Sequence, residues 1–205
     1  MDAAAALSCS ASGSRLLMAA ASPPAPHEAC LAADEAALAE VTRLKAEGNT
    51  HYSDRHFEQA LSAYSLALAA VPERWLASKG SPPAVLSAAG LCLRQQAAVV
   101  LANRAAANMG LRKAVAALAD AQRAADLDPA YWKAHWRCGL ALMMMGVRIE
   151  RSEQAIAAFK RALSCDGLPP AERENVCKAL EAAEHRLREG RDALDMPDLS
   201  ECVVS

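Results

Sequence analysis

Small residues recur at one fixed spacing in three stretches of the chain. Each stretch begins with a small residue and has an alanine further on. Four residues after this alanine comes a position that is large in two of the stretches, and a second alanine follows three residues later. The positions are Gly48, Ala60, Tyr64 and Ala67; Ala105, Ala117, Ala121 and Ala124; and Gly139, Ala155, Phe159 and Ala162. The third stretch carries four extra residues before its first alanine. This spacing predicts pairs of helices that touch at their small residues and stack as an array.

The composition agrees with an all-helical chain. About 50 of the 205 residues are alanine, which has the highest helix propensity and is depleted in strands. Hydrophobic residues make up 53% of the chain but aromatic residues only 4%, so we expect a core of Ala and Leu side chains. Prolines are excluded from helix interiors, and they leave four proline-free stretches at 27–71, 84–128, 130–168 and 171–196. The first three can each hold two antiparallel helices and the last can hold one, which predicts seven helices.

The repeated unit resembles the tetratricopeptide repeat. Pro72 and Pro129 close the second helix of two units, as the pattern of that repeat requires. The resemblance covers about residues 35–167. The second unit departs from the other two, because it has Ala121 at the position that Tyr64 and Phe159 hold in the first and third units. It implies an all-α fold, a right-handed α-solenoid of three helix pairs plus a C-terminal capping helix.

The expected boundaries follow from the three units. Repeat 1 is expected at about 41–74, repeat 2 at about 98–131 and repeat 3 at about 132–168. Because the closing prolines are too far apart for one repeat of about 34 residues, residues from about 75 to 97 are predicted to be an insertion. It is expected to start as a loop around Gly80–Pro83 and then to lengthen the first helix of repeat 2. A helical stripe predicts a capping helix at about 170–190, formed by Val176, Leu180, Ala183 and Leu187.

The two ends of the chain lie outside the repeat pattern. Residues 1–33 are rich in Ala, Ser and Pro, and a disordered leader is expected, with an organelle transit peptide as the alternative. Residues 191–205 are expected to be a flexible acidic tail. The tail ends in Cys202 and three further residues that fit the C-a-a-X pattern for prenylation. Coincidence is the alternative, since no polybasic signal accompanies it, and one prenyl chain at Cys202 would give only reversible membrane contact.

Several classes of protein are excluded. A net charge of −2 argues against a nucleic-acid binder, and no apolar stretch reaches the roughly 18 residues of a membrane span. No phosphate-binding glycine loop, HExxH or GxSxG motif is present, so we expect no catalytic residue, no cofactor and no enzyme activity. The seven cysteines form no CxxC pair and show no metal-ligand spacing. Reduced thiols are therefore expected, with a disulfide framework or a metal site as alternatives.

Five polar residues fall on the first helices of the three units, which line the concave groove of such an array. Lys45 and Asn49 lie four residues apart in repeat 1, and Lys133 and Arg137 do the same in repeat 3, so each pair projects from one helix face. Asn103 comes from repeat 2. Cations and amides give charge-assisted and directional hydrogen bonds to carboxylates. The groove is therefore predicted to bind two carboxylates, such as those of a C-terminal aspartate.

In type and place, these five residues match the dicarboxylate clamp of tetratricopeptide-repeat co-chaperones. The resemblance implies a non-enzymatic, cytoplasmic adaptor that binds the C-terminal Glu-Glu-Val-Asp of seventy- or ninety-kilodalton heat-shock chaperones. It also implies that Lys45, Asn49 and Asn103 hold mainly the terminal carboxylate. Lys133 and Arg137 would then hold mainly the aspartate side chain and nearby backbone.

Two further expectations concern what surrounds the clamp. His135, Cys138 and Ala106 are expected to contact the ligand residues that precede the terminal aspartate. The alternative function is a scaffold whose groove binds an unrelated acidic peptide for complex assembly or organelle import.

Overall fold

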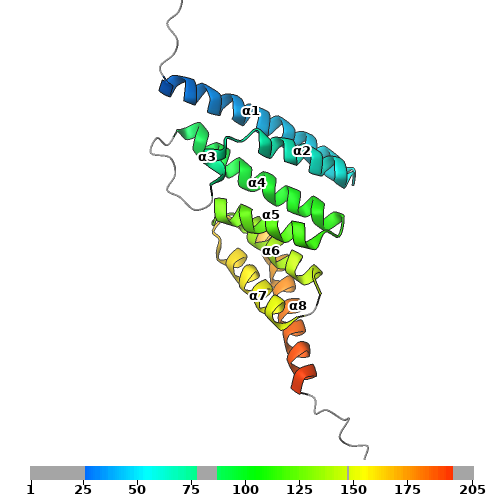
Figure 1. The fold of residues 1–205 in the computed structure, drawn as a ribbon. Helices are drawn as coiled ribbons and strands as arrows, with labels where there is room; N and C mark the ends of the chain where they lie inside the picture. The colour runs from blue at the N-terminus through cyan, green and yellow to red at the C-terminus, as the bar shows by residue number, and fades with distance from the viewer. Residues whose placement is uncertain (1–25, 78–86, 147, 196–205) are drawn as a thin grey trace, which may run out of the picture.

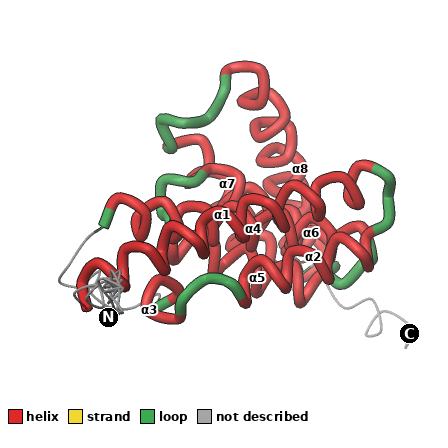
Figure 2. Tube along the Cα trace, turned by 90° about the horizontal axis from the view of Figure 1, so that it is seen from above, coloured by secondary structure: helices red, strands yellow, loops and turns green. Residues whose placement is uncertain are grey.

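The structure is a computed structural model that describes residues 26–77, 87–146 and 148–195. Within these ranges the chain forms helices joined by loops and turns, which Figure 2 shows from above. The helices are α1 (Pro26–Ser53), α2 (Phe57–Ala69), α3 (Glu73–Leu76), α4 (Ala88–Gly110), α5 (Ala114–Leu127), α6 (Trp132–Met144), α7 (Ile149–Ser164) and α8 (Pro170–Asp195).

Three helix pairs stack in chain order. α1 packs on α2, α4 on α5 and α6 on α7, and α8 packs on α7. Figure 1 shows the stack running from α1 and α2 at one end to α7 and α8 at the other. The first helices of the three pairs also contact one another, α1 with α4 and α4 with α6, so they form one row. This arrangement confirms the predicted all-α solenoid of three helix pairs with a C-terminal helix.

The recurring small and large residues explain how closely the helices pair. A Cβ atom added at Gly48 would lie 2.5 Å from the ring of Tyr64, and one added at Gly139 would collide with the ring of Phe159. Both rings are almost fully buried. A side chain at either glycine would therefore push the two helices of its pair apart. In the second pair, the fully buried Ala121 takes the place of the aromatic residue.

The short helix α3 is one more helix than the sequence predicted. Its Trp75 is buried, and the indole ring occupies the space beside Gly90 at the start of α4. The carboxylate of Asp34 accepts hydrogen bonds from Trp75 Nε1 (3.0 Å) and Ser87 Oγ (3.3 Å) and pairs with Arg74. Since a buried carboxylate needs such partners, this cluster joins α1, α3 and the start of α4.

The helix bounds differ from the prediction at both ends of the repeat array. α1 begins at Pro26, so the expected disorder was wrong for residues 26–33. The Asp34 cluster supplies the physical reason, because it ties this end of α1 to residues more than 40 positions away. α8 reaches Asp195, past the predicted end near residue 190. Residues 1–25, Gly80–Pro83 and Cys202 lie outside the described residues.

Candidate functional site

Asn49, Asn103 and Arg137 form a chain of hydrogen bonds that links α1, α4 and α6. The hydroxyl of Tyr64 donates to Asn49 Oδ1 (2.8 Å), and Asn103 Nδ2 donates to the same oxygen (3.0 Å). Arg137 Nη1 donates to Asn103 Oδ1 (3.2 Å). The structure thus brings together three of the five predicted site residues, one from the first helix of each repeat.

These hydrogen bonds use the acceptor atoms of the two amides and leave donors unused. An amide side chain has one carbonyl oxygen and two N–H groups. Within the described residues, Asn49 Nδ2 makes no hydrogen bond, Asn103 Nδ2 makes one, and Arg137 uses one of its nitrogens. A ligand at this point must therefore supply acceptors, which a carboxylate does.

A pocket of about 180 Å³ adjoins the three side chains. Its other lining residues are Tyr52, Ser53, Tyr64 and Ala106, and none of the lining residues is acidic. A water molecule takes up about 30 Å³ of liquid volume, so the pocket has room for a carboxylate group. Its lining of amides, hydroxyls and a guanidinium group suits an anion.

Arg137 is partly buried and has no carboxylate beside it. Arg104, another partly buried arginine, pairs with Asp120 (2.6 Å). No Asp or Glu of the described residues lies within ion-pair distance of Arg137. Burial lowers the pKa of the Arg137 guanidinium, while neighbouring tyrosine side chains act in the opposite direction. A desolvated cation without a counter-ion is the kind of group that a bound anion stabilises.

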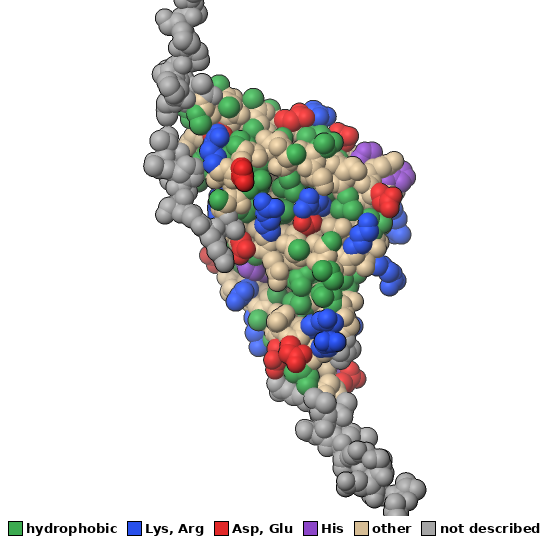
Figure 3. Space-filling model, viewed as in Figure 1, with side chains coloured by type: hydrophobic (Ala, Val, Ile, Leu, Met, Phe, Trp, Pro, Cys, Tyr) green, Lys and Arg blue, Asp and Glu red, His purple; other side chains and the backbone are tan. Residues whose placement is uncertain are grey.

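The positive charge at this site is local. Figure 3 shows Lys, Arg, Asp and Glu side chains interspersed over the face that it displays, without one continuous basic field. The net charge of the chain is −2. The chain as a whole therefore carries no net positive charge that would attract an anion.

Lys45 and Lys133 flank the pocket and are absent from its lining. Lys45 Nζ donates to Gln96 Oε1 (2.5 Å), and Lys133 Nζ lies 5.5 Å from the centroid of the Trp132 ring. Across the described part of the chain, neither lysine is paired with a carboxylate. Each is four residues from a pocket residue on the same helix, so its long side chain shares that helix face.

The three residues expected to contact the ligand upstream of its terminal aspartate line two different pockets. His135 and Cys138 line a second pocket, of about 450 Å³, between α5, α6 and α7, whereas Ala106 lines the pocket beside Arg137. His135 and Cys138 are thus separated from the pocket beside Arg137, and their contact with upstream ligand residues stays a prediction. The reason is helical geometry, because these positions lie about 200° and 100° around the helix from Arg137.

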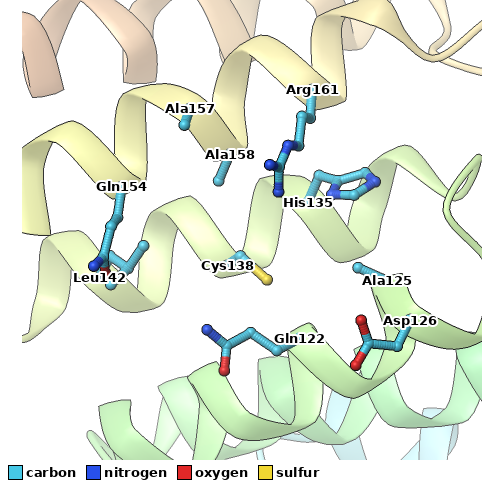
Figure 4. Close-up of a pocket in the computed structure, with 10 residues that line it drawn as sticks. All are labelled: Gln122, Ala125, Asp126, His135, Cys138, Leu142, Gln154, Ala157, Ala158 and Arg161. Atoms are coloured by element: carbon cyan, nitrogen blue, oxygen red, sulfur yellow. The ribbon is translucent and has the colours of Figure 1, made fainter. Parts of the chain in front are cut away.

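The second pocket contains a thiol of low reactivity. Figure 4 shows Gln122 and Asp126 of α5 facing Arg161 of α7 across it. Burial raises the pKa of the Cys138 thiol to about 12, so this thiol is protonated at neutral pH and is a poor nucleophile. The described residues contain no group of three or more His, Cys, Asp or Glu side chains that could hold a metal ion.

Tyr64 and Gln96 each form a hydrogen bond with a predicted site residue, and neither was predicted to do so. The sequence pattern assigned Tyr64 to packing alone, although Tyr in place of Phe at this position is a signal for a hydrogen bond. Gln96 lies in the inserted segment, outside the repeat pattern, and nothing in the sequence links it to Lys45.

No family model matches the chain, but curated proteins do. The chain is 27% identical over 134 residues to "Small glutamine-rich tetratricopeptide repeat-containing protein 2" of Saccharomyces cerevisiae, which covers 65% of this chain and 31% of that protein. It is 33% identical over 119 residues to "ER protein translocation subcomplex subunit sec67" of Schizosaccharomyces pombe, covering 57% and 55%. The chain thus spans between about a third and just over half the length of these relatives.

Solved structures share the fold. The Sgt2 tetratricopeptide-repeat domain from Aspergillus fumigatus has a TM-score of 0.57 at 24% identity, covering 78% of this chain and 86% of that one. The TPR2B domain of yeast Sti1, solved in a complex with pHsp70, has a TM-score of 0.55 at 19% identity, covering 72% and 98%. The predicted tetratricopeptide-repeat fold is therefore confirmed for this chain.

Proposed function

We propose that this protein is a non-enzymatic, cytoplasmic adaptor that captures the C-terminal tail of a seventy- or ninety-kilodalton heat-shock chaperone. The observation that carries the proposal is the partly buried Arg137, which has no carboxylate partner within the described residues and stands at the end of the Asn49–Asn103 chain. The ligand is a peptide that ends in a free aspartate, of the Glu-Glu-Val-Asp type.

The five residues divide between the two carboxylates of the terminal aspartate. Asn49 and Asn103 line the pocket and have unused N–H groups, and Lys45 adds a charge from the same face of α1. These three hold the terminal carboxylate. Arg137 and Lys133, from one face of α6, hold the side-chain carboxylate and the adjoining backbone. Recognition of a chain's C-terminal carboxylate is an established mode of peptide binding.

The comparisons support this choice of partner. The TPR2B domain of yeast Sti1 is a structural neighbour whose solved complex contains pHsp70. The match to the small glutamine-rich tetratricopeptide-repeat protein of yeast extends over 134 residues. The fold supports a peptide-binding groove, and the clamp residues determine which ligand that groove would bind.

A second candidate is a scaffold that binds an unrelated acidic peptide during organelle import. One observation favours it: the relative in Schizosaccharomyces pombe is named as a subunit of an ER translocation subcomplex. Such a scaffold would use the same groove and the same cations for a different acidic chain.

A competition pull-down separates the two candidates. Immobilised protein is incubated with cytosol, with or without an excess of a synthetic peptide that ends in Glu-Glu-Val-Asp. The chaperone adaptor should retain a seventy- or ninety-kilodalton chaperone, and the peptide should release it. Retention of other proteins, without either chaperone, would contradict the chaperone proposal and favour the scaffold.

A further inference from the structure

We propose that Gln96 is a sixth residue of the carboxylate site and that it binds the ligand together with Lys45. The inference rests on the proposed function, because it adds a residue to the same site. Gln96 lies on α4 before the expected start of repeat 2, in the extension that the insertion provides. The inserted segment would therefore take part in ligand binding as well as in folding.

Gln96 lies on the groove side of α4. It precedes Asn103 by seven residues, which is nearly two full turns at about 3.6 residues per turn, so the two side chains share a helix face. The direction of that face is given by two contacts from α4 to α1. Gln96 accepts a hydrogen bond from Lys45, and Asn103 donates one to Asn49.

The contact with Lys45 fixes the orientation of the Gln96 amide. A lysine ammonium group has three N–H donors and no acceptor, so the oxygen of Gln96 must face it. The Nε2 group of Gln96 then has no hydrogen-bond partner in the described ranges, and Lys45 keeps two further donors. A carboxylate that binds Lys45 meets the N–H groups of Gln96 beside it, and its two oxygens can accept from both side chains.

Contacts of the residues that precede Gln96 hold this part of α4 in place. Arg94 Nε donates to the carbonyl oxygen of Leu127 (3.1 Å), and Arg94 Nη1 donates to that of Ala77 (2.9 Å). The start of the same helix is packed by Trp75 against Gly90. The position of Gln96 is therefore set before a ligand arrives, which lowers the entropic cost of binding.

Calorimetric titration of the full chain with a peptide ending in Glu-Glu-Val-Asp tests the proposal. Gln96→Ala should weaken binding by about 3- to 10-fold, which is the usual range for the net contribution of one hydrogen bond in a groove open to solvent. Gln96→Glu should weaken it by more than about 10-fold, because the new carboxylate still accepts from Lys45 but repels the ligand.

The neighbouring Gln95 is exposed and makes no recorded side-chain contact, so it offers matched controls. Gln95→Ala and Gln95→Glu make the same chemical changes on another face of α4, and each should change affinity by less than about twofold. Circular dichroism of all four variants should show unchanged helical content.

A peptide amidated at its C-terminus separates this proposal from the proposed function. Wild-type protein and Gln96→Ala should bind the amide about equally weakly, because the amide lacks the charged carboxylate that Gln96 and Lys45 bind together. If wild type prefers the free acid but Gln96→Ala binds that acid as tightly as wild type, or more tightly, the role of Gln96 is overturned and the clamp stands. If wild type binds acid and amide equally, the clamp itself is contradicted.

Discussion

Tyr64 connects the packing of the first repeat to the candidate site. Its ring fills the space beside Gly48, and its hydroxyl orients Asn49. Burial raises the pKa of this hydroxyl to about 12, so it remains a hydrogen-bond donor at any physiological pH. The corresponding residue of repeat 3 is Phe159, which has no hydroxyl to donate. In repeat 1 the large residue therefore contributes both to packing and to the site, whereas in repeat 3 it contributes to packing alone.

Arg137 should matter for binding more than for folding. Arg137→Ala removes a partly buried cation that has no carboxylate partner in the described residues, so stability should be unchanged or slightly raised. Affinity for a peptide ending in Glu-Glu-Val-Asp should fall by at least about tenfold, since hydrogen bonds between charged groups contribute about 1.5–3 kcal/mol. Calorimetry and denaturant unfolding measure the two effects.

Arg161 provides the matched control for Arg137. It is an exposed arginine that lines the second pocket, and Arg161→Ala should leave peptide affinity within about twofold of wild type. Equal losses from the two substitutions would place the ligand across both pockets and contradict the assignment to the smaller one.

At the scale of the helices, the sequence predicted the contacts that repeat and missed those that occur once. The pairing of Gly48 with Tyr64 and of Gly139 with Phe159 follows a spacing that three units share. The Asp34 cluster and the Lys45–Gln96 contact each join residues more than 40 positions apart and occur in one place only. Their partners have no periodic signature, so α3 and the early start of α1 could not be predicted.

The close approach of α1 and α2 makes a specific prediction at Gly48. Gly48→Ala should destabilise the fold by about 1–3 kcal/mol, because the new methyl group overlaps the buried ring of Tyr64. Gly167→Ala is the control, since no atom lies within 4 Å of its added Cβ. Thermal unfolding followed by circular dichroism should show a lower Tm for the first variant alone. An unchanged Tm for Gly48→Ala would mean that the helices can separate at little cost.

At the scale of the whole molecule, the stack brings one helix from each repeat into a single row. The five predicted clamp residues come from α1, α4 and α6, and the sequence placed them on these helices because the repeat pattern fixes the register. The structure adds how they interact: three are joined by hydrogen bonds, while Lys45 contacts Gln96 and Lys133 lies over the Trp132 ring. Side-chain partners such as Gln96 and Trp132 depend on packing between repeats, which spacing along the chain does not reveal.

The central claim is that the groove recognises a free C-terminal carboxylate, and calorimetry with two peptides tests it most directly. One peptide ends in Glu-Glu-Val-Asp with a free carboxylate, and the other is identical but amidated. The free acid should bind wild-type protein at least about tenfold more tightly, because amidation removes one of two charges that the clamp holds. The preference should shrink as salt is added, since the flanking lysines are partly open to solvent. Equal affinity for the two peptides would contradict the account.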